Sequence, residues 1–211
     1  MKLTDALSIT TIGVTGPSGA GKGAFSACLA RRGLPVIDAD AVYHELLTPP
    51  SPCLDALVDR FGVNILRSDG SLDRSAMAAL VFAEGDAAKQ AKADLERISH
   101  TFVTERIQKK LQDMAVSGTL AAVIDAPLLI EAGLTSDCDI VVAVLADRDV
   151  RLARLRQRDD RPDEALNARL DAQPADDFYR RHADVVVLNQ SGTDALQEQA
   201  DAILNRMGLP L

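Results

Sequence analysis

Continuous apolar runs alternate with segments of helical spacing along much of the chain. Five runs rich in Val, Ile and Ala are typical of strands buried on both faces of a parallel sheet. They occupy residues 8–15, 34–37, 121–124, 140–145 and 184–188. Helical spacing of apolar residues follows the first two runs, over 24–29 and 42–47, and residues 193–207 form an amphipathic pattern. The alternation predicts an α/β fold with a doubly wound, mainly parallel five-stranded sheet.

The alternation stops between residues 48 and 118. Pro49, Pro50 and Pro52 interrupt the chain, and apolar residues then recur at helical intervals over residues 54–61. Asp69 and Gly70 form a turn dipeptide, after which residues 76–82 and 87–114 are expected to be helical. We therefore expect residues 48–118 to be a helical insertion in a core made of residues 1–47 and 119–211.

The composition is that of a globular chain with an acidic surface. The 211 residues are 47% hydrophobic and 26% charged, with a formal net charge of -8, and they suffice for one domain with an inserted lobe. The acidic balance argues against nucleic-acid and membrane partners, which favour a basic face. Residues 1–10 resemble no targeting signal, and the best apolar run, 140–146, is too short to span a bilayer. A soluble, cytoplasmic protein is expected.

The three cysteines predict no metal or disulfide site. Cys28, Cys53 and Cys138 are far apart, odd in number and flanked by apolar residues. Three buried free thiols, and hence a reducing compartment, are the simplest interpretation.

A glycine-rich loop separates the first predicted strand from the first predicted helix. Such a loop directs backbone N–H groups at a phosphate, the helix dipole favours an anion, and a lysine reaches the β- and γ-phosphates. The alternative is a glycine-rich turn that happens to contain a lysine. The context of strand, loop and helix favours nucleotide phosphate binding. The residues expected to bind the nucleotide are Gly16, Ser18, Gly19, Ala20, Gly21, Lys22, Gly23 and Ala24.

The loop departs from the usual phosphate-binding pattern after the lysine. The position that normally supplies a Ser or Thr hydroxyl to Mg²⁺ is Gly23, and Ala24 follows it. Adenylate kinases also place a glycine after the lysine, although a Thr follows there. Mg²⁺ keeps several waters and needs few protein ligands, so metal use is still expected. Ser18 and Ser26 are both candidates to replace the missing hydroxyl.

Three acidic residues follow predicted strands, at the sheet edge where open α/β folds bind ligands. Asp38 or Asp40 could orient an acceptor hydroxyl and take its proton during phosphoryl transfer, while the other caps the helix that follows. Asp125, at the end of the strand over 121–124, could hold Mg²⁺ through a water or could cap a turn.

Arginines gather on one helical arc after the fourth strand. Arg151, Arg154 and Arg158 are spaced to share one helix face, in a chain that is otherwise acidic. Arginine suits the clamping of phosphate oxygens. The alternative for each one is a solvated ion pair with a nearby aspartate. For the group, we expect a mobile lid over ATP at about residues 148–180.

At this point the chain resembles a known family, the dephospho-CoA kinases. The resemblance covers nearly the whole chain, and the order and spacing of its motifs carry it. The motifs are the phosphate loop, VIDADAVYHELL (36–47), FGVNIL…DGSLDR (61–74), LERISH (95–100), DAPLLIEAGL (125–134), CDIVVAV (138–144), RLARLRQRD (151–159), ARLDAQ (168–173) and HADVVVLNQSG (182–192). It implies ATP-dependent phosphorylation of the ribose 3′-hydroxyl of dephospho-CoA, the last step of coenzyme A biosynthesis.

The resemblance also assigns roles. Asp40 corresponds to the catalytic acidic residue, with Lys22 and Arg158 assisting transfer, and the insertion receives the CoA moiety. The acceptor site would comprise Asp38, Asp40, Arg74, His100, Asp125 and Leu128, and ATP would contact Arg154, Arg158, Asn189 and Gly192. Without the resemblance, His100 would be an ordinary helix residue. Gly23, Ala24, Thr101 after the histidine and one extra residue in the loop at 189–192 depart from the family pattern. ATP and Mg²⁺ are the implied cofactors, and a monomer is expected because the family is usually monomeric.

Two other functions stay open from the residues alone. An adenylate-kinase-like small-molecule kinase would share the loop, although the Asp-Gly-Phe-Pro-Arg acceptor signature is absent. A non-catalytic nucleotide sensor could have kept the loop and lost turnover with the hydroxyl. A GTPase is disfavoured because no Asn-Lys-x-Asp motif occurs.

Overall fold

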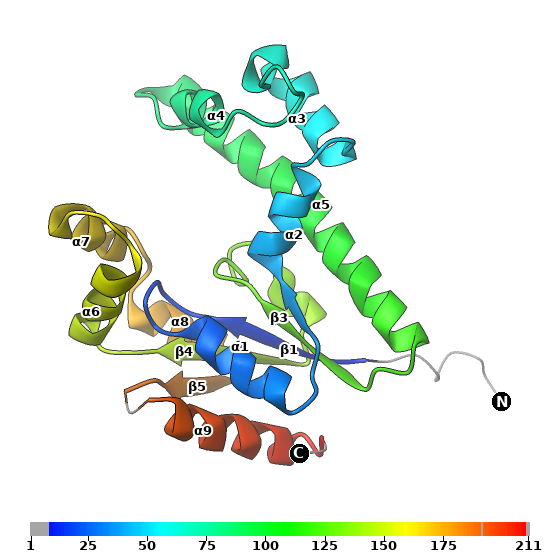
Figure 1. Cartoon of the computed structure of the whole chain (residues 1–211), viewed down its shortest axis with the longest axis vertical. Helices are drawn as coiled ribbons and strands as arrows, with labels where there is room; N and C mark the ends of the chain where they lie inside the picture. Colours follow the sequence, from blue (N-terminus) through cyan, green and yellow to red (C-terminus); the bar gives the residue numbers. More distant parts are fainter. Residues whose placement is uncertain (1–8, 191, 210–211) are drawn as a thin grey trace. The chain divides into compact units, whose positions relative to one another are not determined.

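The computed structural model describes residues 9–190 and 192–209 (Figure 1). Ser8, expected at the start of the first strand, and Ser191, in the loop at 189–192, lie outside the described residues. Contacts within the chain divide it into two compact units. The core unit holds the described residues up to Asp38 and from Leu111 onward, and the helical unit holds Ala39–Lys110. The functional division into core, 48–118 insertion and lid stays a proposal.

The core unit is built on five parallel strands in the order β2-β3-β1-β4-β5. The strands are β1 (Thr10–Thr15), β2 (Val36–Asp38), β3 (Ala121–Asp125), β4 (Ile140–Leu145) and β5 (Val185–Leu188). Their β-branched, continuously apolar sequences suit strands that helices cover on both faces. The predicted α/β class and parallel sheet are confirmed, and β2 lies one to two residues further along than expected.

The strand order places the phosphate loop at the middle of the sheet. The central strand β1 pairs with β3 on one side and β4 on the other. The chain passes from β3 to β4 across β1, and ligands of open α/β sheets bind at the carboxyl ends of strands around such a point. In the register, Asp125 lies opposite both Val14 of β1 and Asp38 of β2.

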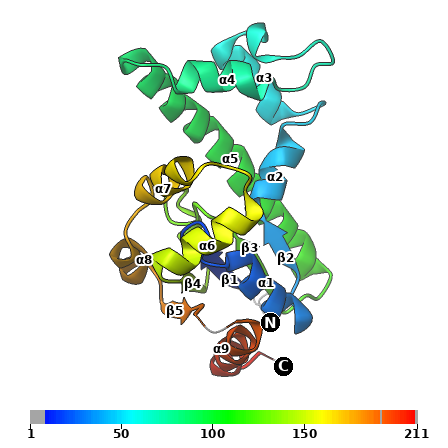
Figure 2. The same ribbon diagram turned by 60° about the vertical axis from the view of Figure 1, so that its left-hand side comes forward.

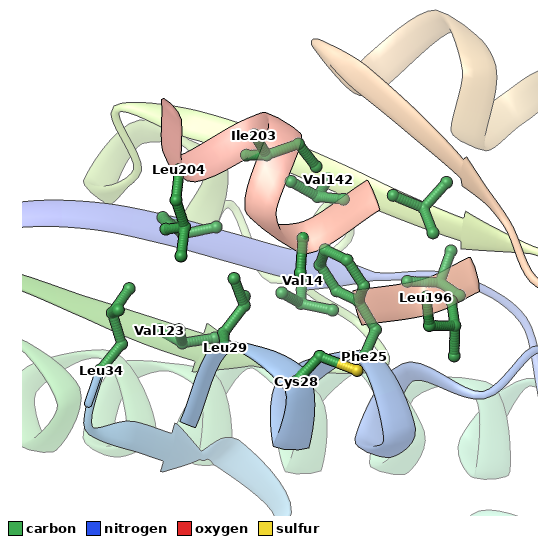
Figure 3. Packing of buried hydrophobic residues seen from close by; sticks show 14 of the residues in the cluster. Val14, Phe25, Cys28, Leu29, Leu34, Val123, Val142, Leu196, Ile203 and Leu204 are labelled. Atoms are coloured by element: carbon green, nitrogen blue, oxygen red, sulfur yellow. The ribbon is translucent and has the colours of Figure 1, made fainter. Parts of the chain in front are cut away.

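Helices α1 (Lys22–Arg31) and α9 (Thr193–Arg206) pack on one face of this sheet. Figure 3 shows Phe25 and Leu29 of α1 and Leu196 of α9 packed around Val14 and Val142 of the strands. Because side chains alternate along a strand, Ala143 and Leu145 face the other way, where Tyr179 of α8 (Asp176–His182) covers them. The sheet is therefore covered on both faces.

Two further helices follow β4. Leu155 of α6 (Arg148–Arg158) packs with Leu166 and Leu170 of α7 (Asp163–Asp171) in a small separate cluster. Figure 2 brings this helix pair to the front. The arginines of the sequence pattern lie on α6, and a short 3-10 helix, η2 (Leu134–Asp137), precedes β4.

The helical unit contains α2 (Ala39–Leu46), α3 (Pro52–Phe61), the 3-10 turn η1 (Val63–Ile65), α4 (Arg74–Val81) and the part of α5 (Asp86–Val116) up to Lys110. Ser51 caps α3 by accepting from the Leu54 N–H, and Asp73 caps α4. The Asp69-Gly70 turn is confirmed, since Gly70 N–H donates to the Arg67 carbonyl. Helices in the described ranges include none long and apolar enough to cross a membrane.

Candidate active site

The phosphate loop wraps tightly between β1 and α1, and a side chain at Gly16, Gly19 or Gly21 would collide with neighbouring backbone or a buried side chain. Gly16 has φ +139°, and a Cβ there would lie 2.1 Å from the Val144 carbonyl oxygen. Gly21 has φ +97°, and its Cβ would lie 2.1 Å from Nδ2 of Asn189. Side chains are excluded at these positions, which keeps the loop backbone close to its neighbours.

Lys22 is the first residue of α1, where the helix dipole favours an anion. Its Nζ donates to the Gly16 carbonyl at 3.0 Å, so the ammonium group folds back over the start of the loop. The expected lysine therefore lies at the place where nucleotide phosphates would meet the loop.

Arg151 of α6 ties the loop to Gln173, just beyond α7. Its Nε donates to the Ser18 carbonyl at 3.0 Å and its Nη2 to the Gln173 side chain at 3.3 Å. The same Gln173 oxygen accepts from the Ser18 N–H at 2.9 Å. Burial lowers the pKa of the Arg151 guanidinium, and the charge of Asp176, 3.6 Å away, opposes that shift. Arg151 thus serves the loop as a buried brace.

Arg154 bridges the loop and the segment after β5. Its Nη1 donates to the carbonyls of Gly19 and Ala20 at 3.2 and 3.1 Å. Its Nη2 donates to the carbonyl and side-chain oxygens of Asn189 at 3.0 and 3.1 Å. Asn189, which is 4% exposed, adds a 2.8 Å bond from Nδ2 to the Ala20 carbonyl. The expected nucleotide residues Arg154 and Asn189 are thus joined to each other and to the loop.

Arg158 has a different partner. Its Nε donates to Asp159 at 2.7 Å, and this pairing lowers the pKa of the Asp159 carboxyl. Asp159 also accepts from Arg169 of α7 at 3.1 Å, and Arg169 donates from Nε to the Ser18 hydroxyl at 3.2 Å. Asp159 therefore pairs with two arginines, Arg158 and Arg169, and Arg169 also reaches the loop.

Carboxylates gather at the ends of β2 and β3. Asp125 accepts a 2.7 Å hydrogen bond from the Ser26 hydroxyl of α1, and Asp38 is its neighbour across the strand pair. Helix α2 begins at Ala39, earlier than expected, so Asp38 directly precedes the helix and Asp40 lies in its first turn. Of the two, Asp38 stands where a helix cap would be.

The chain after β3 turns past β1. The Thr15 hydroxyl donates to the Pro127 carbonyl at 3.2 Å, and the Ala126 N–H donates to the Val14 carbonyl. Leu128 follows this turn and is 52% exposed, so its side chain is available to a ligand.

In the helical unit, Arg74 begins α4 and is exposed, and His100 is half-buried on α5. Burial raises the pKa of the Tyr43 hydroxyl on α2, and the nearby charge of Arg74 opposes that shift.

Comparison with known proteins shows which family the chain belongs to. A family model described as dephospho-CoA kinase matches residues 10–195. The chain is 40% identical to a dephospho-CoA kinase of Anaeromyxobacter dehalogenans over 193 residues, which is 92% of this chain and 90% of that one. The chain belongs to the dephospho-CoA kinase family.

Solved structures agree on the fold. A Thermus thermophilus protein, TT1252, matches with a TM-score of 0.77 and 27% identity over 94% of this chain and 98% of its own. Dephospho-CoA kinase from Campylobacter jejuni matches with a TM-score of 0.67 and 24% identity over 93% and 96% of the two chains. The family resemblance drawn from the motifs is confirmed.

The sequence alone did not predict three contacts of the phosphate loop. Arg169 and Gln173 bind the Ser18 region, and the Arg151 side chain is buried on the Ser18 carbonyl. Arg169 lies in the last turn of α7 and Gln173 two residues beyond the end of that helix, and both lie on the face of the helix end that meets Ser18. Nothing local in the sequence indicated that this face meets the phosphate loop.

Proposed function

We propose that this protein transfers the γ-phosphoryl group of ATP to the ribose 3′-hydroxyl of dephospho-CoA, giving CoA and ADP. The observation that carries the proposal is the phosphate loop at the end of β1, braced by Arg151 and Arg154 of the lid helices, in a member of this family. The reaction is the last step of coenzyme A biosynthesis.

The loop and its braces form the ATP site in this proposal. Backbone N–H groups of the loop would bind the phosphate oxygens, and Lys22 would contact the β- and γ-phosphates. Asn189 and Gly192, after β5, would border the adenine. Arg158 would leave Asp159 to stabilise the charge of the transferred group. The remaining loop contacts would come from residues 16, 18–21, 23 and 24.

The residues at the sheet edge fit a magnesium ion. Mg²⁺ in phosphoryl-transfer sites takes one or two carboxylates together with phosphate oxygens and waters. Asp125 offers such a carboxylate, directly or through a water, at the end of the strand beside β1. When bound, the ion would neutralise charge on the β- and γ-phosphate oxygens.

Asp40 is the proposed base for the acceptor. It would accept the proton of the 3′-hydroxyl while that oxygen bonds to the γ-phosphorus and the bond from phosphorus to the bridging oxygen of ADP breaks. Its support is its place in the first turn of α2, two residues beyond the end of β2. Asp38, Arg74, His100 and Leu128 would position the acceptor.

A cytoplasmic location and a monomeric state complete the proposal, with ATP, Mg²⁺ and dephospho-CoA as the small-molecule partners. Biosynthesis of a cytoplasmic cofactor and the free state of all three cysteines support the location. Neither nucleic acid nor a membrane is required by the chemistry.

The test measures ADP formation with ATP, Mg²⁺ and one acceptor at a time. Dephospho-CoA should support turnover with CoA as the second product, identified by mass, and AMP should not. ADP release with AMP and none with dephospho-CoA would favour an adenylate-kinase-like enzyme. ATP binding without turnover on either acceptor would favour a nucleotide sensor.

A further inference from the structure

The phosphate loop leaves open space where related loops carry a hydroxyl. Gly23 is exposed on the first turn of α1. Among the described residues, no heavy atom outside its own helix lies within 4 Å of a Cβ built at Gly23. The loop therefore carries no hydroxyl at this position, and no described side chain outside α1 fills the space.

The structure separates the two serines that could compensate. The Ser18 hydroxyl accepts from Arg169 of α7, so it faces the lid helices. The Ser26 hydroxyl donates to Asp125 Oδ2 at 2.7 Å, and Ser26 is only 3% exposed. Only Ser26 therefore acts on the carboxylate that fits a magnesium ion.

Helix geometry explains how Ser26 reaches this position. Residues three apart on a helix are neighbours, and side chains lean toward the preceding turn. Ser26 is three residues after Gly23, so its side chain leans toward the turn on which the missing hydroxyl would stand. Asp125 approaches the same helix from the end of β3, beside β1.

A hydrogen bond from Ser26 would limit the rotation of the Asp125 carboxylate. Bonds to an ionised group are short and strong, and the buried position of Ser26 keeps water from competing for the bond. Outer partners of this kind orient metal ligands, and their loss typically costs roughly 10- to 100-fold in metal affinity.

We propose that Ser26 is a positioning residue for Mg²⁺, which holds Asp125 in place and so replaces the hydroxyl that the loop lacks at Gly23. The inference rests on the proposed function, because the ion would arrive with ATP. Ser26 need not touch the ion. It acts by fixing the direction of the Asp125 carboxylate, which would face the bound phosphates.

The experiment measures binding of AMP-PNP, a non-hydrolysable ATP analogue, by calorimetry in saturating Mg²⁺ and in excess EDTA. The ratio of the two dissociation constants reports the contribution of the metal, independently of turnover. Ser26→Ala should lower this ratio by roughly 10-fold while leaving binding in EDTA unchanged. Asp125→Asn should also lower the ratio, and in EDTA it should bind no more weakly than wild type, because a negative charge is removed.

Two further variants make the test specific. Cys28→Ala removes one buried γ atom from the same helix without touching Asp125, and it should keep the wild-type ratio. Adding Gly23→Ser to the Ser26→Ala variant supplies a hydroxyl in the open space and should restore most of the ratio. Thermal unfolding of each variant verifies that the fold is intact.

The possible outcomes distinguish this inference from the proposed function. The role of Ser26 is overturned by any of three results. These are an unchanged ratio of dissociation constants in Ser26→Ala, an equal fall of that ratio in Cys28→Ala, or no recovery when Gly23→Ser is added. Those results would leave the proposed function intact if the wild-type chain turns over dephospho-CoA and binds AMP-PNP more tightly with Mg²⁺. A wild-type chain with neither would overturn the proposed function, and the inference with it.

Discussion

Replacing Arg154 by alanine should loosen the phosphate loop and the segment after β5 together. The side chain makes four hydrogen bonds of 3.0–3.2 Å, to the carbonyls of Gly19 and Ala20 and to two oxygens of Asn189. In the variant, three backbone carbonyls lose a charged donor, while the bond from Asn189 to the Ala20 carbonyl remains.

The expected loss of stability is smaller than the sum of four bonds. Hydrogen bonds to charged groups contribute about 1.5–3 kcal/mol each, but bonds from one group are not additive and water can reach a half-buried site. We expect a loss of about 2–3 kcal/mol in the free energy of unfolding. For a chain of this size that corresponds to a fall in Tm of roughly 5–10 °C.

The matched control is Arg156→Ala, two residues along the same helix. Arg156 is exposed and pairs only with Asp163 among the contacts described for it, so its removal should leave the free energy of unfolding almost unchanged. Denaturant unfolding compares the two variants, and titration with AMP-PNP should show weaker binding for Arg154→Ala alone. Equal stability and equal nucleotide affinity in both variants would refute the bracing role.

Four other outcomes are expected. Lys22→Met should lower the rate of transfer by roughly 10² or more with the fold intact, since a loop lysine stabilises the transferred phosphates, and near-normal kcat at saturating ATP would contradict this. Asp40→Asn should lower the single-turnover rate by roughly 10²–10⁴ with both substrates still bound, whereas Asp38→Asn should retain more activity, and the reverse order would assign the base to Asp38. Arg158→Ala should raise the KM for ATP and lower kcat, and a change confined to the KM for dephospho-CoA would show that Arg158 serves the acceptor instead. Burial, with nearby aspartates, raises the pKa of the Cys138 thiol to about 12. The contribution of this thiol to the stability of the folded state is therefore complete below the unfolded pKa near 9 and is lost as pH rises toward 12. Between neutral and alkaline pH, wild type should lose more free energy of unfolding than Cys138→Ala, and parallel curves of stability against pH for the two proteins would contradict the shift.

Much of this fold could be read from the sequence because its signals are local. Each strand is a continuous apolar run, and burial on both faces allows no other pattern. The glycines of the phosphate loop predict a backbone that only glycine can adopt, as Gly16 and Gly21 show. The start of α2 differs from the expected one: the helix begins at Ala39, directly after Asp38 ends β2, and no glycine or proline between them marks the boundary.

The partners of the charged side chains were decided only by the tertiary structure. Arg151, Arg154 and Arg158 share a helical arc and a residue type, yet two of them bind the loop and the third binds Asp159. Their spacing predicts a common face but not what that face meets.

The same holds for the hydroxyl groups near the proposed magnesium position. The sequence shows that Gly23 lacks a hydroxyl and that Ser18 and Ser26 are both near enough along the chain to replace it. The choice depends on Asp125, which is 99 residues from Ser26 and approaches it only because β3 pairs with β1. Local backbone preferences are set by neighbouring residues, whereas a hydrogen bond across such a separation exists only once the sheet has brought its two ends together.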